Sequence, residues 1–128
     1  MPVAPIRQRR VRMPRQWLEM GESSGYLTYV IEDPARRAVA GYVCYGPTPL
    51  TASTYDLYWI AVDPGAQGGG NGRALLAFAE SDIARRGGRL LLIETASHEA
   101  YAATIRFYER AGYVLMSRIP DYYRPGDD

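Results

Sequence analysis

The fold of this chain is decided by the stretch Val62-Asp63-Pro64-Gly65-Ala66-Gln67-Gly68-Gly69-Gly70-Asn71-Gly72-Arg73-Ala74-Leu75-Leu76. It joins an apolar run typical of a strand to a run with helical spacing of apolar residues. The first N–H groups of a helix lack intrahelical partners, and the helix dipole places partial positive charge at that end. Glycines let the backbone adopt positive φ and let a ligand approach it. The stretch therefore predicts a phosphate site; the alternative is a glycine-rich turn without a ligand.

Two well-known phosphate loops do not fit these residues. No Gly-Lys-Ser or Gly-Lys-Thr closes the loop, so the lysine and hydroxyl that hold a nucleoside triphosphate and its magnesium are missing. A dinucleotide fingerprint starting at Gly68 would need glycine in place of Arg73, and one starting at Gly70 would need it in place of Leu75. The pattern is instead Gln-x-x-Gly-x-Gly, from Gln67 to Gly72.

The composition bounds the possible classes of protein. The 128 residues fit one domain, and 15 basic residues against 14 acidic ones give a net charge of +1. This balance gives no argument for a nucleic-acid or membrane partner, and we expect neither. The single cysteine, Cys44, excludes an internal disulfide, and one histidine leaves no cluster at metal-ligand spacing, so we expect no metal. No apolar run reaches the length of a membrane span, and we expect a cytoplasmic protein.

The rest of the chain divides into elements around this loop. Residues 1–16 hold five arginines and three prolines and predict a mobile basic arm, followed by a single domain over 17–128. Runs rich in aromatic and β-branched residues predict strands at 26–31, 38–45, 54–62 and 90–94, the first two forming an antiparallel hairpin. The last run is almost wholly apolar, as expected for a parallel strand covered on both faces. Helices are predicted over 71–86, with Leu75, Leu76, Ala79 and Ile83 inward, and over 102–111, and a final strand begins at Tyr113.

A second motif follows the predicted 90–94 strand. It reads Tyr101-Ala102-Ala103-Thr104-Ile105-Arg106-Phe107-Tyr108-Glu109-Arg110-Ala111-Gly112-Tyr113. With the Gln67–Gly72 loop it resembles the GNAT superfamily, the Gcn5-related N-acetyltransferases, over roughly residues 26–119. Tyr101 stands where the family usually has asparagine, and Thr104 where it usually has alanine. The resemblance implies an α/β (α+β) fold: a mixed, mostly antiparallel sheet with a central, splayed pair of parallel strands, flanked by helices.

The resemblance also implies a reaction, the transfer of an acetyl group from acetyl-coenzyme A to a primary amine. The pantetheine arm would bind between the splayed strands, with the Ile60 N–H supporting the acetyl carbonyl oxygen. The pyrophosphate would meet the amides of the loop. The residues implied to bind the coenzyme are Ile60, Ala61, Val62, Gln67, Gly68, Gly69, Gly70, Asn71, Gly72, Arg73, Tyr101 and Thr104.

Three residues are candidates for the proton transfers. Tyr108 matches the general acid of the family; the alternative is that it only packs. Strand alternation places Asp56, Tyr58, Ile60 and Val62 on one face, and Asp56 is the leading candidate for the base. Glu94, at the end of the neighbouring strand, could instead relay a proton through water. Each carboxylate has the alternative role of a surface charge or a structural hydrogen bond.

Other side chains attract attention but fit simpler roles. Cys44 lies in an apolar run and is expected to be a core residue, and His98 is expected to be solvated or to cap a helix. An aromatic group either walls an acceptor pocket or simply suits half-buried strands: Tyr42, Tyr45, Tyr55, Tyr58 and Trp59.

Several questions about function stay open at this stage. The resemblance implies a small-molecule or peptide amine as the acceptor. Proteins with this pair of motifs accept aminoglycosides, polyamines, amino acids, peptide N-termini or protein lysines, and the fold does not choose among them. A non-enzymatic alternative is an acyl-coenzyme A binding or regulatory module. Because an exposed sheet edge can pair with a second copy of the chain, we expect a homodimer.

Overall fold

The computed structural model describes residues 10–12, 25–33 and 38–128. By their contacts the residues fall into two compact units, 1–93 and 94–128, which we describe one at a time. Of the predicted basic arm, only Arg10–Arg12 belong to the described residues, and they form strand β1. The rest of the arm lies outside them, and a single domain over 17–128 stays a prediction.

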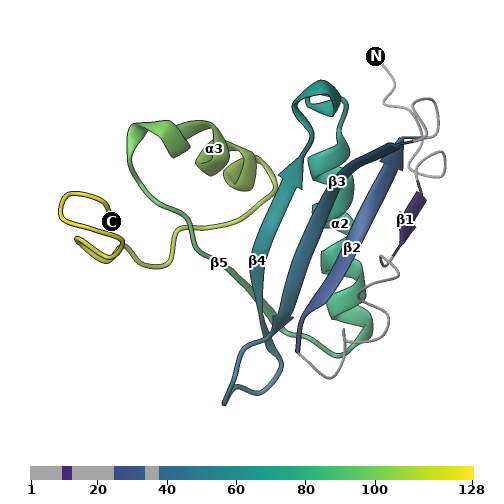
Figure 1. Cartoon of the computed structure of the whole chain (residues 1–128). Helices are drawn as coiled ribbons and strands as arrows, with labels where there is room; N and C mark the ends of the chain where they lie inside the picture. The colour runs from purple at the N-terminus through teal and green to yellow at the C-terminus, as the bar shows by residue number, and fades with distance from the viewer. Residues whose placement is uncertain (1–9, 13–24, 34–37) are drawn as a thin grey trace. The chain divides into compact units, whose positions relative to one another are not determined.

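The first unit contains a five-stranded sheet in the order β1-β2-β3-β4-β5 (Figure 1). Its pairs are antiparallel except for β4 and β5, which are parallel. The strands are β1 (Arg10–Arg12), β2 (Leu27–Asp33), β3 (Ala38–Pro47), β4 (Thr54–Val62) and β5 (Leu90–Ile93). Helix α2 (Asn71–Arg85) connects β4 to β5 and packs against one face of the sheet. The predicted hairpin, the parallel pair and the mixed α+β sheet are therefore confirmed.

The core lies between α2 and the sheet. Leu75 and Leu76 are fully buried, and Ala79 and Ile83 are buried with them, so the predicted inward stripe of this helix is confirmed. Across from the helix, Gly41 allows a close approach. A Cβ atom there would lie 2.5 Å from the Ala61 carbonyl oxygen and 3.2 Å from Leu75 Cδ1. A side chain at this position would therefore clash with the backbone of β4 and crowd the Leu75 side chain of α2.

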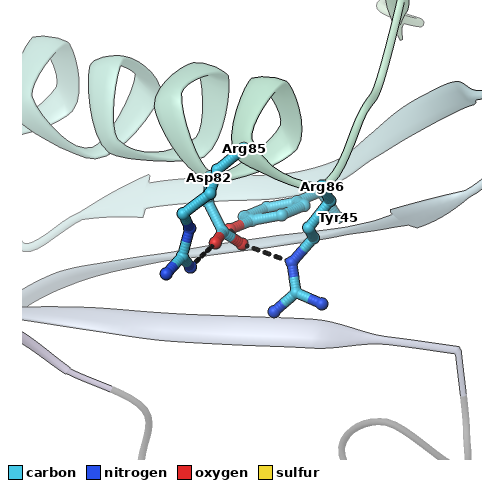
Figure 2. Close-up of polar contacts among 4 residues, drawn as sticks. All are labelled: Tyr45, Asp82, Arg85 and Arg86. Carbon is cyan, nitrogen blue, oxygen red and sulfur yellow. Dashed lines mark hydrogen bonds and ion pairs between the residues drawn. The ribbon is translucent and has the colours of Figure 1, made fainter.

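A buried charged group fastens the other end of α2 to the sheet. The Asp82 carboxylate accepts hydrogen bonds from the Tyr45 hydroxyl at 2.6 Å, from Arg86 Nε at 2.9 Å, and from Arg85. Figure 2 shows these four side chains together. Burial acts to raise the pKa of Asp82, but these three hydrogen bonds outweigh it and leave the pKa below its ordinary value. Burial, and then the bond to Asp82, raise the pKa of Tyr45, so this phenol stays protonated.

Strand β4 contains a bulge that the sequence analysis did not anticipate. Cys44 on β3 pairs with Trp59, but the next residue, Tyr45, pairs with Leu57. One residue of β4, Tyr58, is therefore extra at this point. An extra residue on one strand interrupts the alternation of side chains along it, which changes which residues of β4 share a face.

Strand β5 departs from its prediction in burial. Leu90 and Leu92 are 57% and 45% exposed, so the strand is not covered on both faces as its apolar run suggested. The reason is its position: β5 is the edge of the described sheet, and α2 packs most closely against β3 and β4. A strand that is buried on both faces needs an apolar sequence, but an apolar sequence alone does not place other elements against both faces.

The second unit contains a short 3₁₀ turn, η3 (Glu99–Tyr101), that leads into helix α3 (Ala102–Arg110). The predicted helix over 102–111 is confirmed. The final strand predicted from Tyr113 is wrong, because residues 113–119 belong to no strand of the described chain. Their apolar side chains are exposed, including Val114, Leu115 and Met116. A strand needs a neighbouring strand to form hydrogen bonds with, as well as residues that favour strands.

No helix within the described ranges is long and apolar enough to cross a bilayer.

The Asp82 contacts predict a pH-dependent stability. Asp82→Asn removes a buried carboxylate that binds one hydroxyl and two arginines, and should lower the free energy of unfolding by about 3 kcal/mol at pH 7. Because the folded-state pKa is lowered, this stability is present above the unfolded-state value of about 3.9 and is lost as pH falls through the folded-state value. Urea unfolding from pH 7 down to pH 3 should show the two proteins converging below about pH 4.

Glu80→Gln is the matched control, since Glu80 lies on the exposed side of the same helix. It should change the free energy of unfolding by less than about 0.5 kcal/mol. Equal stabilities of the wild type and Asp82→Asn at pH 7 would contradict this description of the Asp82 contacts.

Candidate active site

The loop between β4 and α2 has the backbone geometry that its glycines predict. After the 3₁₀ turn η2 (Pro64–Ala66), Gly68 has φ +82° and Gly70, which caps α2, has φ +80°. Both values lie in the left-handed region that glycine adopts without strain. A Cβ at Gly68 would meet no atom within 4 Å, so this glycine is required by its φ angle rather than by space.

The first turn of α2 presents unpaired backbone donors. The first intrahelical hydrogen bond runs from the Ala74 N–H to the Gly70 carbonyl oxygen at 3.0 Å. The N–H groups of Asn71, Gly72 and Arg73 precede it and have no acceptor within the helix. Among the residues that the structure describes, no side chain caps this end, and the first turn holds no acidic residue. The partial positive charge of the helix dipole is therefore not offset by an acidic residue of the first turn, and this end of α2 can bind an anion.

Two polar side chains of the loop brace it. Asn71 is buried, and its Nδ2 donates to the Ala66 carbonyl oxygen at 3.0 Å. Gln67 Nε2 donates to the Val62 carbonyl oxygen at 3.3 Å. Both bonds connect the loop to itself or to the end of β4. Asn71, Gln67 and Arg73 were predicted to contact a coenzyme, which stays a prediction. In the structure the side-chain amides of Asn71 and Gln67 donate to backbone oxygens, and Arg73 is exposed.

The parallel pairing of β4 and β5 covers only the first part of β4. The register runs from Thr54 opposite Leu90 to Leu57 opposite Ile93, and ends there. Beyond this point, residues 60–62 pair with β3 alone among the described strands. The backbone of β4 thus continues past its parallel partner toward the glycine loop, as expected for a pair of strands that separate.

The bulge corrects the predicted faces of β4. Tyr45 faces α2, since its hydroxyl binds Asp82, and Val43 and Gly41 follow it on the same face at two-residue spacing. Residues directly opposite in an antiparallel pair share a face. The β4 residues that face α2 are therefore Leu57, Ile60 and Val62.

Asp56 lies on the other face, opposite Gly46. Tyr58 lies there too, because its ring contacts the position where a Gly46 side chain would stand. The prediction that Asp56, Tyr58, Ile60 and Val62 share one face is wrong, because simple alternation does not survive an extra residue. The side chains of Ile60 and Val62 therefore point to one face of the sheet, and those of Asp56 and Tyr58 point to the other.

The remaining predicted site residues belong to the second unit. Tyr108 is half-buried in α3, and burial raises the pKa of its phenol, which keeps it protonated at neutral pH and above. Its ring also packs against Phe107 and Tyr113, with centroids 5.3 and 5.9 Å away. Tyr101 ends η3, Thr104 lies in the first turn of α3, and the exposed Glu94 follows β5. The candidate residues therefore form two sets, one in each unit.

Three simpler expectations can be checked directly. Cys44 is a buried free thiol whose pKa is raised by burial, which confirms a core role. His98 caps η3, since its Nδ1 accepts from the Ala100 N–H at 3.3 Å. Tyr45 cannot wall a pocket, because it is fully buried. No group of three or more His, Cys, Asp or Glu side chains that could hold a metal ion occurs in the described part of the chain.

Comparison with known proteins identifies the family. Residues 24–115 match the family described as Acetyltransferase (GNAT) domain. A protein from Desulfovibrio desulfuricans that carries the description of a GNAT-family acetyltransferase shares 50% identity and a TM-score of 0.81, covering 88% of this chain and 69% of its own. This chain belongs to the GNAT acetyltransferase family and is an acetyl-coenzyme A dependent acetyltransferase. A comparison with curated protein sequences gave no match.

More distant solved structures share the fold. An acetyl transferase from Pyrococcus furiosus is 25% identical with a TM-score of 0.64, covering 81% of this chain and 67% of its own. The ribosomal-protein-S18-alanine N-acetyltransferase from Escherichia coli is 21% identical with a TM-score of 0.68, covering 89% of this chain and 83% of its own. The family assignment confirms the resemblance predicted from the two motifs; the roles of individual residues stay predictions.

The loop geometry predicts the effect of charge at Asn71. Asn71→Ala removes only the brace to Ala66, whereas Asn71→Asp also places a negative charge in the first turn of α2. Acetyl-coenzyme A should bind in the order wild type, Asn71→Ala, Asn71→Asp, with the charge alone weakening binding about tenfold or more. Isothermal titration calorimetry measures the three dissociation constants. Equal constants for the Ala and Asp variants would show that no anion binds at this end of the helix.

Proposed function

We propose that this protein acetylates a primary amine by direct attack of the amine on the thioester of acetyl-coenzyme A, with Tyr108 as general acid and Asp56 as general base. The observation that carries the proposal is the junction of β4 and α2. Three first-turn N–H groups follow a strand end whose backbone lies beyond its parallel partner, and no acidic residue of the turn competes for them. The Gln67–Gly72 motif, which resembles the coenzyme A loop of the family, lies at this junction.

The junction supports binding of the coenzyme through backbone atoms. The N–H groups from Gly68 to Arg73 would hold the pyrophosphate, and the exposed Arg73 guanidinium adds a charge-assisted contact. A hydrogen bond to a charged group contributes about 1.5–3 kcal/mol, so several together dominate affinity. Ile60 and Val62 would pair with the pantetheine amides, and the Ile60 N–H would stabilise negative charge that develops on the acetyl oxygen.

Two proton transfers complete the reaction. Acetyl-coenzyme A supplies the thioester, and its sulfur must be protonated as it leaves. Tyr108 holds its proton at neutral pH because burial raises its pKa, which suits a general acid. An aliphatic amine with pKa near 10.4 is mostly protonated at pH 7 and needs a base. Asp56 is half-buried and has no ion-pair partner within the described residues. Glu94, acting through water, is the alternative base.

Release of free thiol from acetyl-coenzyme A across a panel of amines tests the proposal. The wild type should release thiol with at least one primary amine. Tyr108→Phe removes the proton donor and keeps the ring, so it should bind acetyl-coenzyme A as the wild type does and turn over about 10²- to 10⁴-fold more slowly.

Tyr113→Phe is the matched control, since Tyr113 is the neighbouring ring in contact with Tyr108. It should leave turnover within a fewfold of the wild type. Unchanged turnover in Tyr108→Phe would remove Tyr108 from the mechanism. Thermal stabilisation by acetyl-coenzyme A with no thiol release from any amine would favour the non-catalytic acyl-coenzyme A binding module instead.

The base is tested by the pH dependence of kcat/KM. Asp56→Asn cannot take a proton, so its activity depends on the fraction of amine that is already neutral. Its kcat/KM should be reduced most at pH 6–7 and should rise about tenfold per pH unit toward the pKa of the amine, near 10.4. Glu94→Gln, measured in parallel, should keep the wild-type profile. The opposite pattern would assign the base to Glu94.

Two further properties remain proposals. A homodimer would cover the β5 edge, where Leu90 and Leu92 are exposed. We also propose that the reaction takes place in the cytoplasm, since a chain with a single cysteine forms no internal disulfide.

A further inference from the structure

We propose that the sheet face opposite α2 is a cation site, formed by the rings of Tyr26 and Tyr58 beside Asp56, and that the acceptor is an aliphatic amine bound in its positively charged form. This inference rests on the proposed function and names the substrate class for the same site. It excludes aromatic and other weakly basic amines as preferred acceptors.

The three side chains come together through the register of three strands. Asp56 on β4 lies opposite Gly46 on β3, and Leu27 on β2 lies opposite Tyr45, which places Tyr26 beside Gly46. The rings of Tyr26 and Tyr58 contact each other with centroids 5.1 Å apart and planes at 60°. Both tyrosines are partly exposed, Tyr26 to 45% and Tyr58 to 37%.

Gly46 makes this arrangement possible. A Cβ atom at this position would lie 2.1 Å from the Gly25 carbonyl oxygen and 3.2 Å from Tyr58 Cε2. Without a side chain on β3, the Tyr58 ring and the chain at Gly25 close over the strand. Alternation along β4 keeps Tyr58 on the face that carries Asp56, while the bulge turns Ile60 and Val62 to the other face. The ring pair is therefore set by the backbone of three strands.

The electrostatics of this face favour a cation. Asp56 is half-buried, and no arginine or histidine within the described residues forms an ion pair with it. Burial raises the pKa of Tyr58, and the charge of Asp56 and the neighbouring Tyr26 raise it further, so the ring stays neutral. A neutral tyrosine attracts a cation to its π face, and a carboxylate beside it attracts the same cation.

A cation bound here would lie next to the group that takes its proton. The ammonium N–H bond breaks, and the proton moves to the Asp56 carboxylate, leaving a neutral amine with its lone pair. The amine nitrogen then forms the bond to the acetyl carbon, the carbon–sulfur bond breaks, and the sulfur is protonated through Tyr108 as the new amide loses a proton. Asp56 returns its proton to water. The sum is one ammonium and one thioester giving one amide, one thiol and one proton.

Choline is a suitable probe, because its quaternary nitrogen carries a permanent charge and has no lone pair to acetylate. Its neutral counterpart of the same shape is 3,3-dimethylbutan-1-ol. Titration of the full-length protein, followed by nuclear magnetic resonance, should show choline binding at least tenfold more tightly than the neutral alcohol. Choline should also inhibit thiol release competitively with the amine and not with acetyl-coenzyme A.

Paired variants separate the π surface from the fold. Tyr26→Phe keeps the ring and should bind choline within about threefold of the wild type, whereas Tyr26→Leu should bind it about 5- to 30-fold more weakly. Asp56→Asn should weaken choline binding about tenfold and leave the neutral alcohol unaffected. Unchanged binding of acetyl-coenzyme A in each variant shows that it is folded.

Each outcome decides one claim. Equal affinity for choline and the neutral alcohol, or equal choline affinity in Tyr26→Phe and Tyr26→Leu, would overturn the cation site. Faster acetylation of aniline-type amines than of alkylamines at pH 7 would overturn the substrate class. Selective choline binding without thiol release from any amine would support the cation site and would contradict the proposed function instead.

Discussion

The attachment of α2 to the sheet is the constraint on which the site depends. Near its start, Leu75 of the helix packs over Gly41 of β3, where a Cβ atom would clash with the Ala61 carbonyl oxygen of β4 and crowd the Leu75 side chain. Near its end, the Asp82 carboxylate binds Tyr45 on β3 and forms ion pairs with Arg85, the last residue of α2, and with Arg86, its C-cap. With both ends fixed, the eight residues between Val62 and Asn71 have little freedom, and side-chain hydrogen bonds of Asn71 and Gln67 brace them. The unpaired N–H groups of the first turn are therefore held at the end of β4 before any ligand arrives.

The bulge at Tyr58 sends the side chains before and after it to different faces of β4. It turns Ile60 and Val62 toward α2, so that this part of the strand offers mainly its backbone on the side away from β3. It leaves Asp56 and Tyr58 on the opposite face, where side chains are available for chemistry. Bulges are frequent next to active sites because one extra residue can redirect a side chain without a change of fold. In this account the coenzyme is held by backbone atoms and the amine by side chains.

Much of the fold could be predicted from the sequence because its decisive signals are local. The glycine loop, the flanking strand and the inward stripe of α2 each depend on residues within one or two turns of one another. The bulge could not be predicted, because it is a property of the pairing of β4 with β3 and alternation is the default for either strand alone. The same applies to the Tyr26–Tyr58 contact, which depends on the register of three strands.

The buried position of Asp82 could have been predicted from the sequence, because it lies between Ala79 and Ile83 on the buried stripe and has arginines three and four residues later. The exposed segment after Gly112 shows the opposite error, since apolar residues favour a strand but do not supply its partner.

The central claim is that backbone donors at the start of α2 hold the anionic end of acetyl-coenzyme A. The most direct measurement is an amide nuclear magnetic resonance titration of the protein with acetyl-coenzyme A. The account predicts that the N–H resonances from Gly68 to Arg73 move together and saturate at one dissociation constant, with amide exchange in that turn slowed at saturation. If the coenzyme binds and those resonances stay in place while others move, the anion lies elsewhere and the account is wrong.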